Sequence, residues 1–151
     1  MIEYKVEKLV DCLEEIRPLV EDHHEEVDMY KDKIKVNPDY DKYFAMEGLG
    51  IVHIVTARDD GKLIGYLISF VTPHIHYSDH KYATNDLIFI DASYRKTKTG
   101  FEMLKFAEES LKGEGVDVIN ITMKASHPFD SLCEGLGYTY SEKSYSKYIG
   151  V

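Results

Sequence analysis

The stretch DLIFIDASYRKTKTG (residues 86–100) is the part of the sequence that decides the fold. Its first six residues are rich in branched and aromatic side chains, which predicts a buried strand over 86–91. A polar loop follows, and the residues beyond it keep one helical face apolar as far as Gly113. The run 116–123 is again apolar and predicts a second strand. Because a helix joins these two strands, we expect them to lie parallel in one sheet.

Upstream of this unit, two β-rich runs predict an antiparallel pair. Residues 51–57 and 63–71 are joined by RDDGK (58–62), and its Asp-Gly dipeptide is typical of a tight hairpin turn. A short strand is also expected at Ile2–Lys5, close to the N-terminus.

Two helical segments are expected before the hairpin. Apolar residues recur at helical spacing between about 6 and 30, but Pro18 predicts one interrupted helix or two. Asn37-Pro38 is a good helix start and Gly48 a plausible end, which predicts a second, Tyr-rich helix.

The C-terminal part is expected to hold one more helix and further strands. Ser126 is suited to cap a short helix that Gly135 and Gly137 would end. Tyr138–Val151 is predicted to form one or two last strands. No internal repeat or linker interrupts the chain, so we expect a single domain over residues 1–151.

Composition excludes several classes of protein. The chain has 151 residues, with 18 Lys and Arg against 27 Asp and Glu, a net charge of −9 that argues against nucleic-acid binding. No apolar run is long enough for a membrane span, and the charged N-terminus does not resemble a secretory signal. Cys12 and Cys133 are too few for a disulfide framework. We therefore expect a cytoplasmic protein that binds neither nucleic acid nor membrane.

The acidic excess is concentrated early in the chain. Residues 1–50 carry 7 basic and 14 acidic side chains, whereas residues 51–151 carry 11 and 13. An acidic first third favours a cationic partner or substrate, although solvated acidic helix faces explain the same excess.

The order of elements, together with three pieces between Asp86 and Tyr138, resembles the GNAT family of acyl-CoA-dependent N-acyltransferases. The pieces are the loop after residue 91, the stretch SHPFDSLCEGLGY (126–138), and Asp86 nine residues before Arg95. The resemblance implies an α/β (α+β) GNAT fold, with a mixed central sheet of six to seven strands flanked by about four helices.

The loop is similar to the acyl-CoA loop of that family. Backbone N–H groups at a helix N-terminus, aided by the helix dipole, hold a pyrophosphate. Arg95 and Gly100 are in register with the family pattern, whereas Lys98 stands where its first glycine is usual. A polar helix start is the alternative interpretation. The resemblance implies acetyl-CoA as co-substrate, held by these residues: Phe89, Ile90, Asp91, Arg95, Lys96, Thr97, Lys98, Thr99, Gly100 and Ser126.

Three residues are candidates for the chemistry that the resemblance implies. Asp86 stands where many members have a Glu that takes the proton of the amine, although it is also explained as a strand-end carboxylate. Cys133 falls where the family often has a Tyr that protonates the departing thiolate. A small buried core residue is the alternative for Cys133, and Tyr138 is then a further candidate donor.

Histidines form the other noticeable pattern. His74, His76 and His80 could contribute to a metal site, but no partner motif supports one, and we predict no metal. His23-His24 lies among acidic residues on the first helix, where it fits either a wall of the substrate site or a solvated face.

The leading hypothesis is therefore an acetyl-CoA-dependent N-acetyltransferase that acts on a primary amine by direct attack. The amine would belong to a small molecule or a protein and would be cationic, and a homodimer is a possible assembly of the enzyme. The alternative is a catalytically weak or inactive GNAT-fold protein that binds CoA or another protein. Lys98 and Cys133 are the residues that favour this alternative.

Overall fold

The computed structural model describes residues 1–151 as a mixed α/β fold built on one five-stranded sheet. The strands are β1 (Ile2–Val6), β2 (Val52–Asp59), β3 (Lys62–Pro73), β4 (Lys81–Ile90) and β5 (Val118–Asn120), in that order across the sheet. The helices are α1 (Leu9–Val27), α2 (Tyr40–Gly48), α3 (Thr99–Gly113) and α4 (Asp130–Gly135), with a 3-10 turn at Ala92–Tyr94. The predicted class and helix number are confirmed, but the sheet has five strands instead of six or seven.

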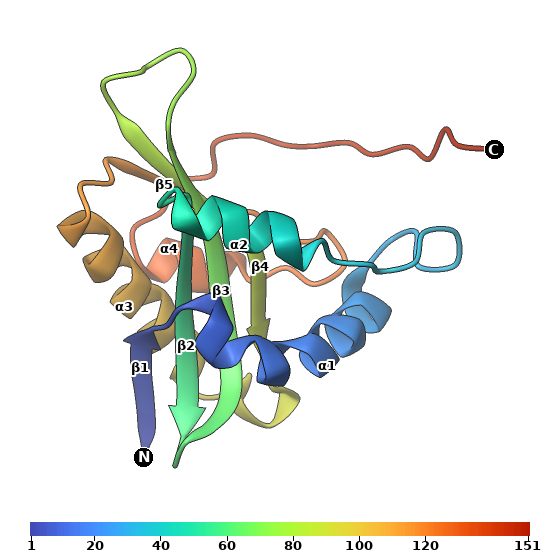
Figure 1. Ribbon diagram of the computed structural model, residues 1–151, viewed down its shortest axis with the longest axis horizontal. Coiled ribbons are helices and arrows are strands. Elements are labelled where there is room, and N and C mark those ends of the chain that lie inside the picture. Colours follow the sequence, from blue (N-terminus) through green and yellow to red (C-terminus); the bar gives the residue numbers. More distant parts are fainter.

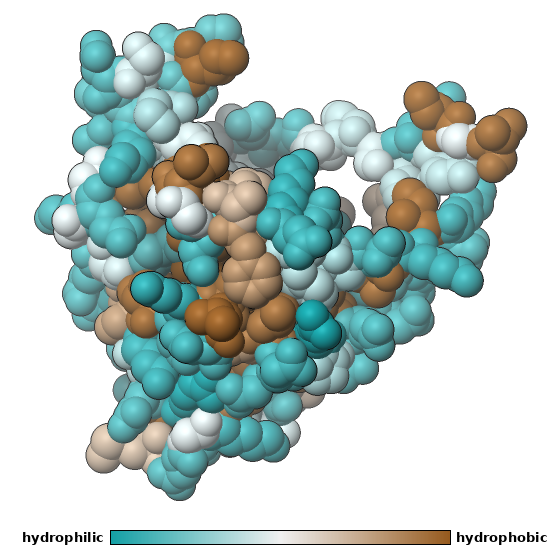
Figure 2. All heavy atoms as spheres, viewed as in Figure 1, coloured by the Kyte–Doolittle hydropathy of each residue, from teal (hydrophilic) through white to brown (hydrophobic).

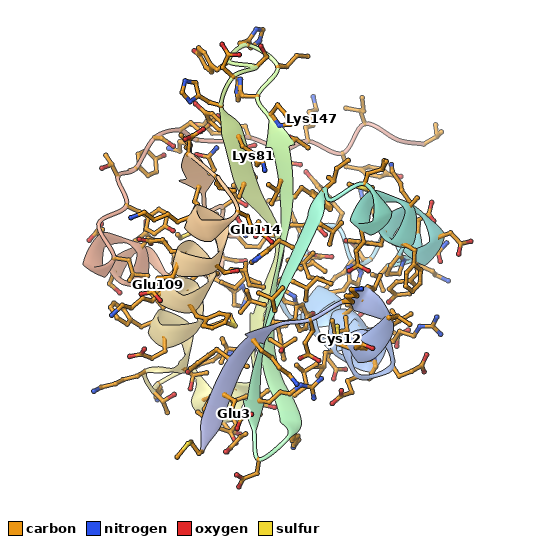
Figure 3. All side chains as sticks on the ribbon, turned by 60° about the vertical axis from the view of Figure 1, so that its left-hand side comes forward. Glu3, Cys12, Lys81, Glu109, Glu114 and Lys147 are labelled. Atoms are coloured by element: carbon orange, nitrogen blue, oxygen red, sulfur yellow. The ribbon has the colours of Figure 1, made fainter.

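The helices cover both faces of the sheet. Cys12 on α1 and Glu109 on α3 lie on opposite sides of it (Figure 3). The buried face of α1 packs on Ile54, Tyr66 and Phe89 to form the larger core. A second core lies between the sheet and α3, where side chains of β2 and β3 meet Met103. The apolar faces of α1 and α3 thus cover the two opposite faces of the central sheet.

The hairpin and the crossover are as the sequence predicts. β2 and β3 pair antiparallel around Asp60 (φ 48°) and Gly61 (φ 87°), the left-handed geometry that a tight Asp-Gly turn requires. α3 carries the chain from β4 to β5, and the two strands pair parallel. However, β5 is only three residues long, because its pairing with β4 stops at Asn120.

The predicted interruption of the first helix is wrong. α1 runs unbroken through Pro18, which is exposed. A proline removes one backbone N–H and therefore one hydrogen bond from the helix. Ile16 and Val20, on either side of it, are both buried in the larger core, and this packing keeps both halves of the helix against the sheet.

Two predicted helix starts are also wrong. α2 is capped by Asp39, whose carboxylate accepts a hydrogen bond from the backbone N–H of Lys42 at 3.0 Å. Aspartate caps as well as asparagine and adds a favourable charge at the helix N-terminus. Ser126 does not cap α4, because its hydroxyl is paired with His127 Nδ1 at 2.9 Å and the helix begins only at Asp130.

The predicted last strands are not formed. Beyond α4 the chain contains no strand, and it extends away from the sheet as an arm that ends at the C-terminus (Figure 1). Tyr140, Tyr145 and Ile149 in this arm are exposed. The arm touches the body through Tyr30, whose hydroxyl lies 3.0 Å from Ser146 Oγ and whose ring packs on Tyr148. No helix of the chain combines the length and apolar character needed to cross a membrane.

A buried histidine makes stability depend on pH. His53 on β2 is 4% exposed; its Nε2 lies 2.9 Å from Ser110 Oγ, and its Nδ1 has no partner. Burial lowers the pKa of His53, although Glu114 opposes this. The folded chain therefore favours neutral His53, and this stability is complete above the unfolded pKa near 6.5 and is lost as pH falls below it.

We expect the free energy of unfolding to fall between pH 7.5 and 5.5, by at most about 1.4 kcal/mol per pH unit for each such group. The replacement His53→Gln removes the titration and keeps a polar group near Ser110, so it should flatten the dependence. Urea denaturation at several pH values measures the effect, with His76→Gln on an exposed loop as control. Equal pH dependence in H53Q and the wild type would contradict this assignment.

Candidate active site

Asp86 lies at a β-bulge on β4. Ile68 pairs with Leu87 and Ser69 pairs with Asn85, so Asp86 is an extra residue opposite β3. The bulge turns both Asp86 and Leu87 toward α1 and α2, where they line the same cavity. Asp86 was expected at the start of a strand, but it lies in the middle of a longer one, where a bulge gives a carboxylate a defined direction.

Tyr43 on α2 holds the Asp86 carboxylate. Its hydroxyl donates a hydrogen bond to Asp86 Oδ2, while Oδ1 makes no hydrogen bond within the chain. Burial and the charge of Asp86 raise the pKa of Tyr43, so the phenol keeps its proton and remains a donor. Asp86 is therefore oriented by one oxygen and open to a ligand through the other.

The strands β4 and β5 separate directly before this carboxylate. Their last pair is Thr84 with Asn120, and the side chain of Asn85 then binds the backbone of Thr122 through Nδ2–O (3.0 Å) and N–Oδ1 (2.6 Å) contacts. The Asn85 side chain thus takes the place of the next backbone-to-backbone pair, and the pairing of β4 with β5 ends there. The second half of β4 consequently has no strand partner on this side.

The N-terminus of α3 lies at the far end of that open half. The backbone N–H groups of Lys98, Gly100 and Phe101 make no hydrogen bond within the chain. The Lys96 and Lys98 side chains are exposed. Free N–H groups at the positive end of a helix dipole, beside two ammonium groups, form a site for phosphate, which we call the α3 anion site.

Other residues of the predicted loop have structural partners. Asp91 caps the 3-10 turn by accepting from the N–H of Ser93 at 2.9 Å. Thr97 and Thr99 bond to one another through their hydroxyls at 2.8 Å, and Thr99 is 2% exposed. The loop is therefore preformed by these side chains, and contacts to phosphate are left to its backbone N–H groups and its basic residues.

Arg95 is bound to α1. Its Nη2 lies 2.9 Å from Glu26 Oε2 in a two-pronged pair, and its Nε donates to Ile90 O at 2.7 Å. The guanidinium also lies over the ring of Phe89. Sequence reasoning placed Arg95 on the cofactor, but in this structure Glu26, 69 residues away in sequence, occupies it.

The end of α1 spans the opening between the separated strands. Glu26 binds Arg95 after β4, and Asp28 lies 3.7 Å from the ammonium group of Lys124 after β5. Between them His23 packs on Phe89, with ring centroids 5.6 Å apart. Burial lowers the pKa of His23 against the opposing influence of Asp28 and Glu26, so its imidazole is neutral at physiological pH.

A cavity of about 330 Å³ lies between α1, α2 and the sheet, and Asp86 lines it. Hydrophobic atoms show between the hydrophilic helix surfaces on this face (Figure 2). We call it the α1–α2 cavity. It is lined by Leu9, Ile16, Val20, Val36, Asn37, Pro38, Asp39, Tyr40, Tyr43, Ile68, Asp86 and Leu87.

The remaining predicted residues lie apart from Asp86. Cys133 is buried in α4, and its carbonyl accepts from the N–H of Tyr138 at 3.0 Å. Burial raises the pKa of both side chains, and Glu108 on α3 contributes to the rise for Tyr138. Neither makes a hydrogen bond to β4. Both would hold a proton at neutral pH, as an acid must, and Cys133 also fits the core interpretation.

The histidines of the β3–β4 loop have other neighbours. The ring of His74 packs at a tilt against those of Tyr77 and Tyr82, with centroids 4.7 and 4.5 Å away, and His80 Nδ1 lies 3.2 Å from Asp117 Oδ2. The structure has no group of three or more His, Cys, Asp or Glu side chains placed to hold a metal ion.

A model of the acetyltransferase (GNAT) family matches residues 11–138 of the chain. The chain belongs to this family. The resemblance seen in the sequence is confirmed, and the match extends well upstream of Asp86, where the sequence resembled the family only in the order of its elements. A comparison of this GNAT protein with curated protein sequences finds no match.

Solved structures share the fold of this GNAT protein. An aminoglycoside acetyltransferase from an uncultured soil metagenomic sample, in complex with sisomicin, has a TM-score of 0.74 at 12% identity, covering 99% of this chain and 96% of that one. A glucosamine-6-phosphate N-acetyltransferase from Arabidopsis thaliana has a TM-score of 0.74 at 12% identity, covering 99% of both chains. A ribosomal-protein-alanine N-acetyltransferase from Brucella melitensis has a TM-score of 0.72 at 16% identity, covering 99% of this chain and 100% of that one. At these identities the likeness shows the fold alone.

The family generally uses acetyl-CoA, and the residues of this GNAT protein fit that group. The α3 anion site offers free N–H groups and two lysines for a pyrophosphate, and the open half of β4 offers an unpaired strand edge for an extended arm. A side chain at Lys98, where the family has glycine, points into solvent and is exposed, so it leaves the backbone N–H accessible. The fit therefore holds despite the departure at this position.

Proposed function

We propose that this GNAT protein is an acetyl-CoA-dependent N-acetyltransferase that modifies a primary amine by direct attack in a ternary complex. The observation that carries the proposal is the placement of two sites on one open strand. Asp86 lies at the bulge of β4, and the α3 anion site lies beyond the end of the same strand. A carboxylate for the amine and a cradle for the cofactor phosphates are thus held by one rigid element.

Acetyl-CoA supplies the acetyl group as a thioester. Asp86 receives the proton of the ammonium group through Oδ1, and Tyr43 keeps the carboxylate in place. The amine nitrogen then bonds to the carbonyl carbon and loses its second proton to solvent, the carbon–sulfur bond breaks, and the sulfur takes a proton from an acid. Tyr138 and Cys133 are the candidate donors of that proton, because burial keeps both protonated.

The structural relatives support an amine acceptor. Three of them are named as acetyltransferases of an aminoglycoside, of glucosamine-6-phosphate and of a ribosomal-protein alanine, all of which present amines. The two cysteines are free and buried, which supports a reducing, cytoplasmic location. A homodimer stays a prediction, and the exposed side chains of the C-terminal arm are the surface that would support it.

The second candidate is a GNAT-fold protein with weak or no catalysis. The pair between Arg95 and Glu26 favours it, because a guanidinium held by a carboxylate is not free for phosphate. An acetyl-CoA titration together with an assay for thiol release separates the two candidates.

We expect Arg95 to exchange Glu26 for phosphate when acetyl-CoA binds. In calorimetric titrations, Glu26→Gln should then raise the affinity for acetyl-CoA by about two- to fivefold, which corresponds to the loss of a partly exposed ion pair. Arg95→Ala should lower that affinity by about tenfold. Glu14→Gln, on the exposed face of α1, is the matched control. A thiol-release assay with a panel of amines measures transfer in the same samples.

The outcomes separate the candidates. Acetyl-CoA binding together with thiol release that depends on an amine supports the transferase. Binding without release for every amine tested would support the catalytically inactive candidate. If E26Q and R95A both bind acetyl-CoA like the wild type, Arg95 is a structural residue and the α3 anion site acts through its backbone N–H groups, Lys96 and Lys98.

A further inference from the structure

We propose, on the basis of the proposed function, that the acceptor is a small amine with a single ammonium group on an apolar body. The ammonium group would meet Asp86, and the apolar body would fill the α1–α2 cavity. An alkyl or aromatic monoamine has this chemistry, whereas a polyamine or an amino sugar does not.

The walls of the cavity carry the first part of this inference. Eight of its twelve lining residues are hydrophobic, and its floor is formed by the buried side chains of Leu9, Ile16 and Ile68. Burial of apolar surface against such a floor stabilises a ligand by about 25 cal/mol per Å². The volume of about 330 Å³ is at the small end of ligand sites, which suits one ring or a short alkyl chain.

The charges around the cavity carry the second part. Asp86 and Asp39 are its acidic lining residues; Oδ1 of Asp39 caps α2 by accepting from the N–H of Lys42, and the floor of Leu9, Ile16 and Ile68 carries no charge. Asp86 therefore offers one open oxygen to one ammonium group. A second ammonium group buried against the apolar floor would lie there without a partner, which is costly.

The mouth of the cavity does not favour a second cation. A neighbouring hollow of similar size shares Val20, Val36 and Tyr40 with it and adds Arg17 and Glu21, which have opposite charges. The Arg17 guanidinium already lies over the ring of Tyr40, 5.0 Å from its centroid. An aromatic face that would attract a cation is thus occupied by one of the protein's own.

Part of the acidic excess of the first fifty residues is held in ion pairs away from the cavity. Glu7 and Glu15 are paired with Arg58, Glu26 with Arg95, and Asp28 with Lys124. Four of the fourteen acidic side chains of residues 1–50 are therefore engaged by basic side chains of the protein itself. Selection of the amine falls to Asp86 and to the apolar walls.

Calorimetric titration of amines into the wild type, without acetyl-CoA, tests this inference separately from catalysis. The probes are 2-phenylethylamine, hexylamine, spermidine and the amino sugar glucosamine. We expect the two monoamines to bind about tenfold or more tightly than spermidine and glucosamine, because only they pair every charge and bury an apolar body.

Two variants locate the binding. Val36→Trp places a larger side chain in the cavity from the half-buried segment before α2, and it should lower the affinity for hexylamine about tenfold. Val10→Trp, on the exposed face of α1, should leave that affinity unchanged. Asp86→Asn should weaken both monoamines by a similar factor. Thermal melts confirm that each variant is folded, and acetyl-CoA titration of V36W should match the wild type.

The results distinguish failure of this inference from failure of the proposed function. Tighter binding of spermidine or glucosamine than of the monoamines would overturn the inference, and their acetylation would still support the transferase. Unchanged hexylamine affinity in a folded V36W protein would also overturn it, because the amine would then bind elsewhere. Monoamine binding that V36W weakens would support the inference even if thiol release failed for every amine.

Discussion

Replacing Asp86 by asparagine is expected to lower kcat about 10²-fold or more while leaving the affinity for acetyl-CoA unchanged. Asparagine has the shape of aspartate and can still accept a hydrogen bond from Tyr43, but it cannot take a proton. Asp86 is exposed at the bulge, so the replacement leaves the core untouched. A thiol-release assay for turnover and calorimetry for acetyl-CoA give the two numbers.

Asp79→Asn is the matched control, because it makes the same chemical change on the exposed β3–β4 loop. Tyr43→Phe is a useful companion, since it removes the hydroxyl that orients the carboxylate and keeps the base. It should lower kcat less than D86N does. Unchanged turnover of D86N at every pH would remove Asp86 from the mechanism, and the neutral imidazole of His23 would be the next group to replace.

The parts of the fold that the sequence predicts correctly depend on neighbouring residues. The Asp60-Gly61 turn determines the β2–β3 hairpin because both residues adopt positive φ. The crossover through α3 follows from one helix between two strands, and its direction from the handedness rule. In each case a few adjacent residues contain the whole signal.

The predicted last strands fail because a strand needs an edge to pair with. Tyr138 and Tyr140 alternate with polar residues as in a strand, but β5 offers an edge of only three residues. The segment SEKSYSK (141–147) adds almost no apolar surface that could be buried against the sheet. An alternating pattern indicates that a segment is compatible with a strand. Whether a neighbouring strand is there to pair with it depends on the whole fold.

The candidate site was predicted only in part, for a related reason. Asp86 and the loop to Gly100 were found because they are close together in sequence. The bulge that directs Asp86 depends on the register between β3 and β4, which no local pattern encodes. Tyr43 and Glu26 reach the site from 43 and 69 residues away, so an isolated Tyr or Glu on a helix gives no signal.

Arg58 provides the largest expected effect on stability. It is 8% exposed on β2, where it donates to Glu7 through Nε and Nη2 (2.9 and 3.2 Å) and to Glu15 through Nη1 and Nη2 (3.0 and 2.8 Å). This pairing joins the sheet to the start of α1, and the guanidinium lowers the pKa of both carboxyl groups. The Glu7 side chain is only 9% exposed, so its charge depends on Arg58.

Arg58→Met is therefore expected to reduce the free energy of unfolding by about 3–5 kcal/mol in urea denaturation at pH 7.5. The cost arises because Glu7 is left charged and buried, and the variant should recover as pH falls, since protonation of Glu7 removes that charge. The difference in free energy of unfolding between R58M and the wild type should thus become smaller from pH 7.5 to pH 5.

The control is Arg17→Met, on the exposed side of α1, which should lower the free energy of unfolding by less than about 1 kcal/mol. A second replacement, Glu7→Leu, should restore part of the stability of R58M. If it destabilises the chain further instead, the loss in R58M comes from packing of the arginine stem and the unpaired charge is not its cause.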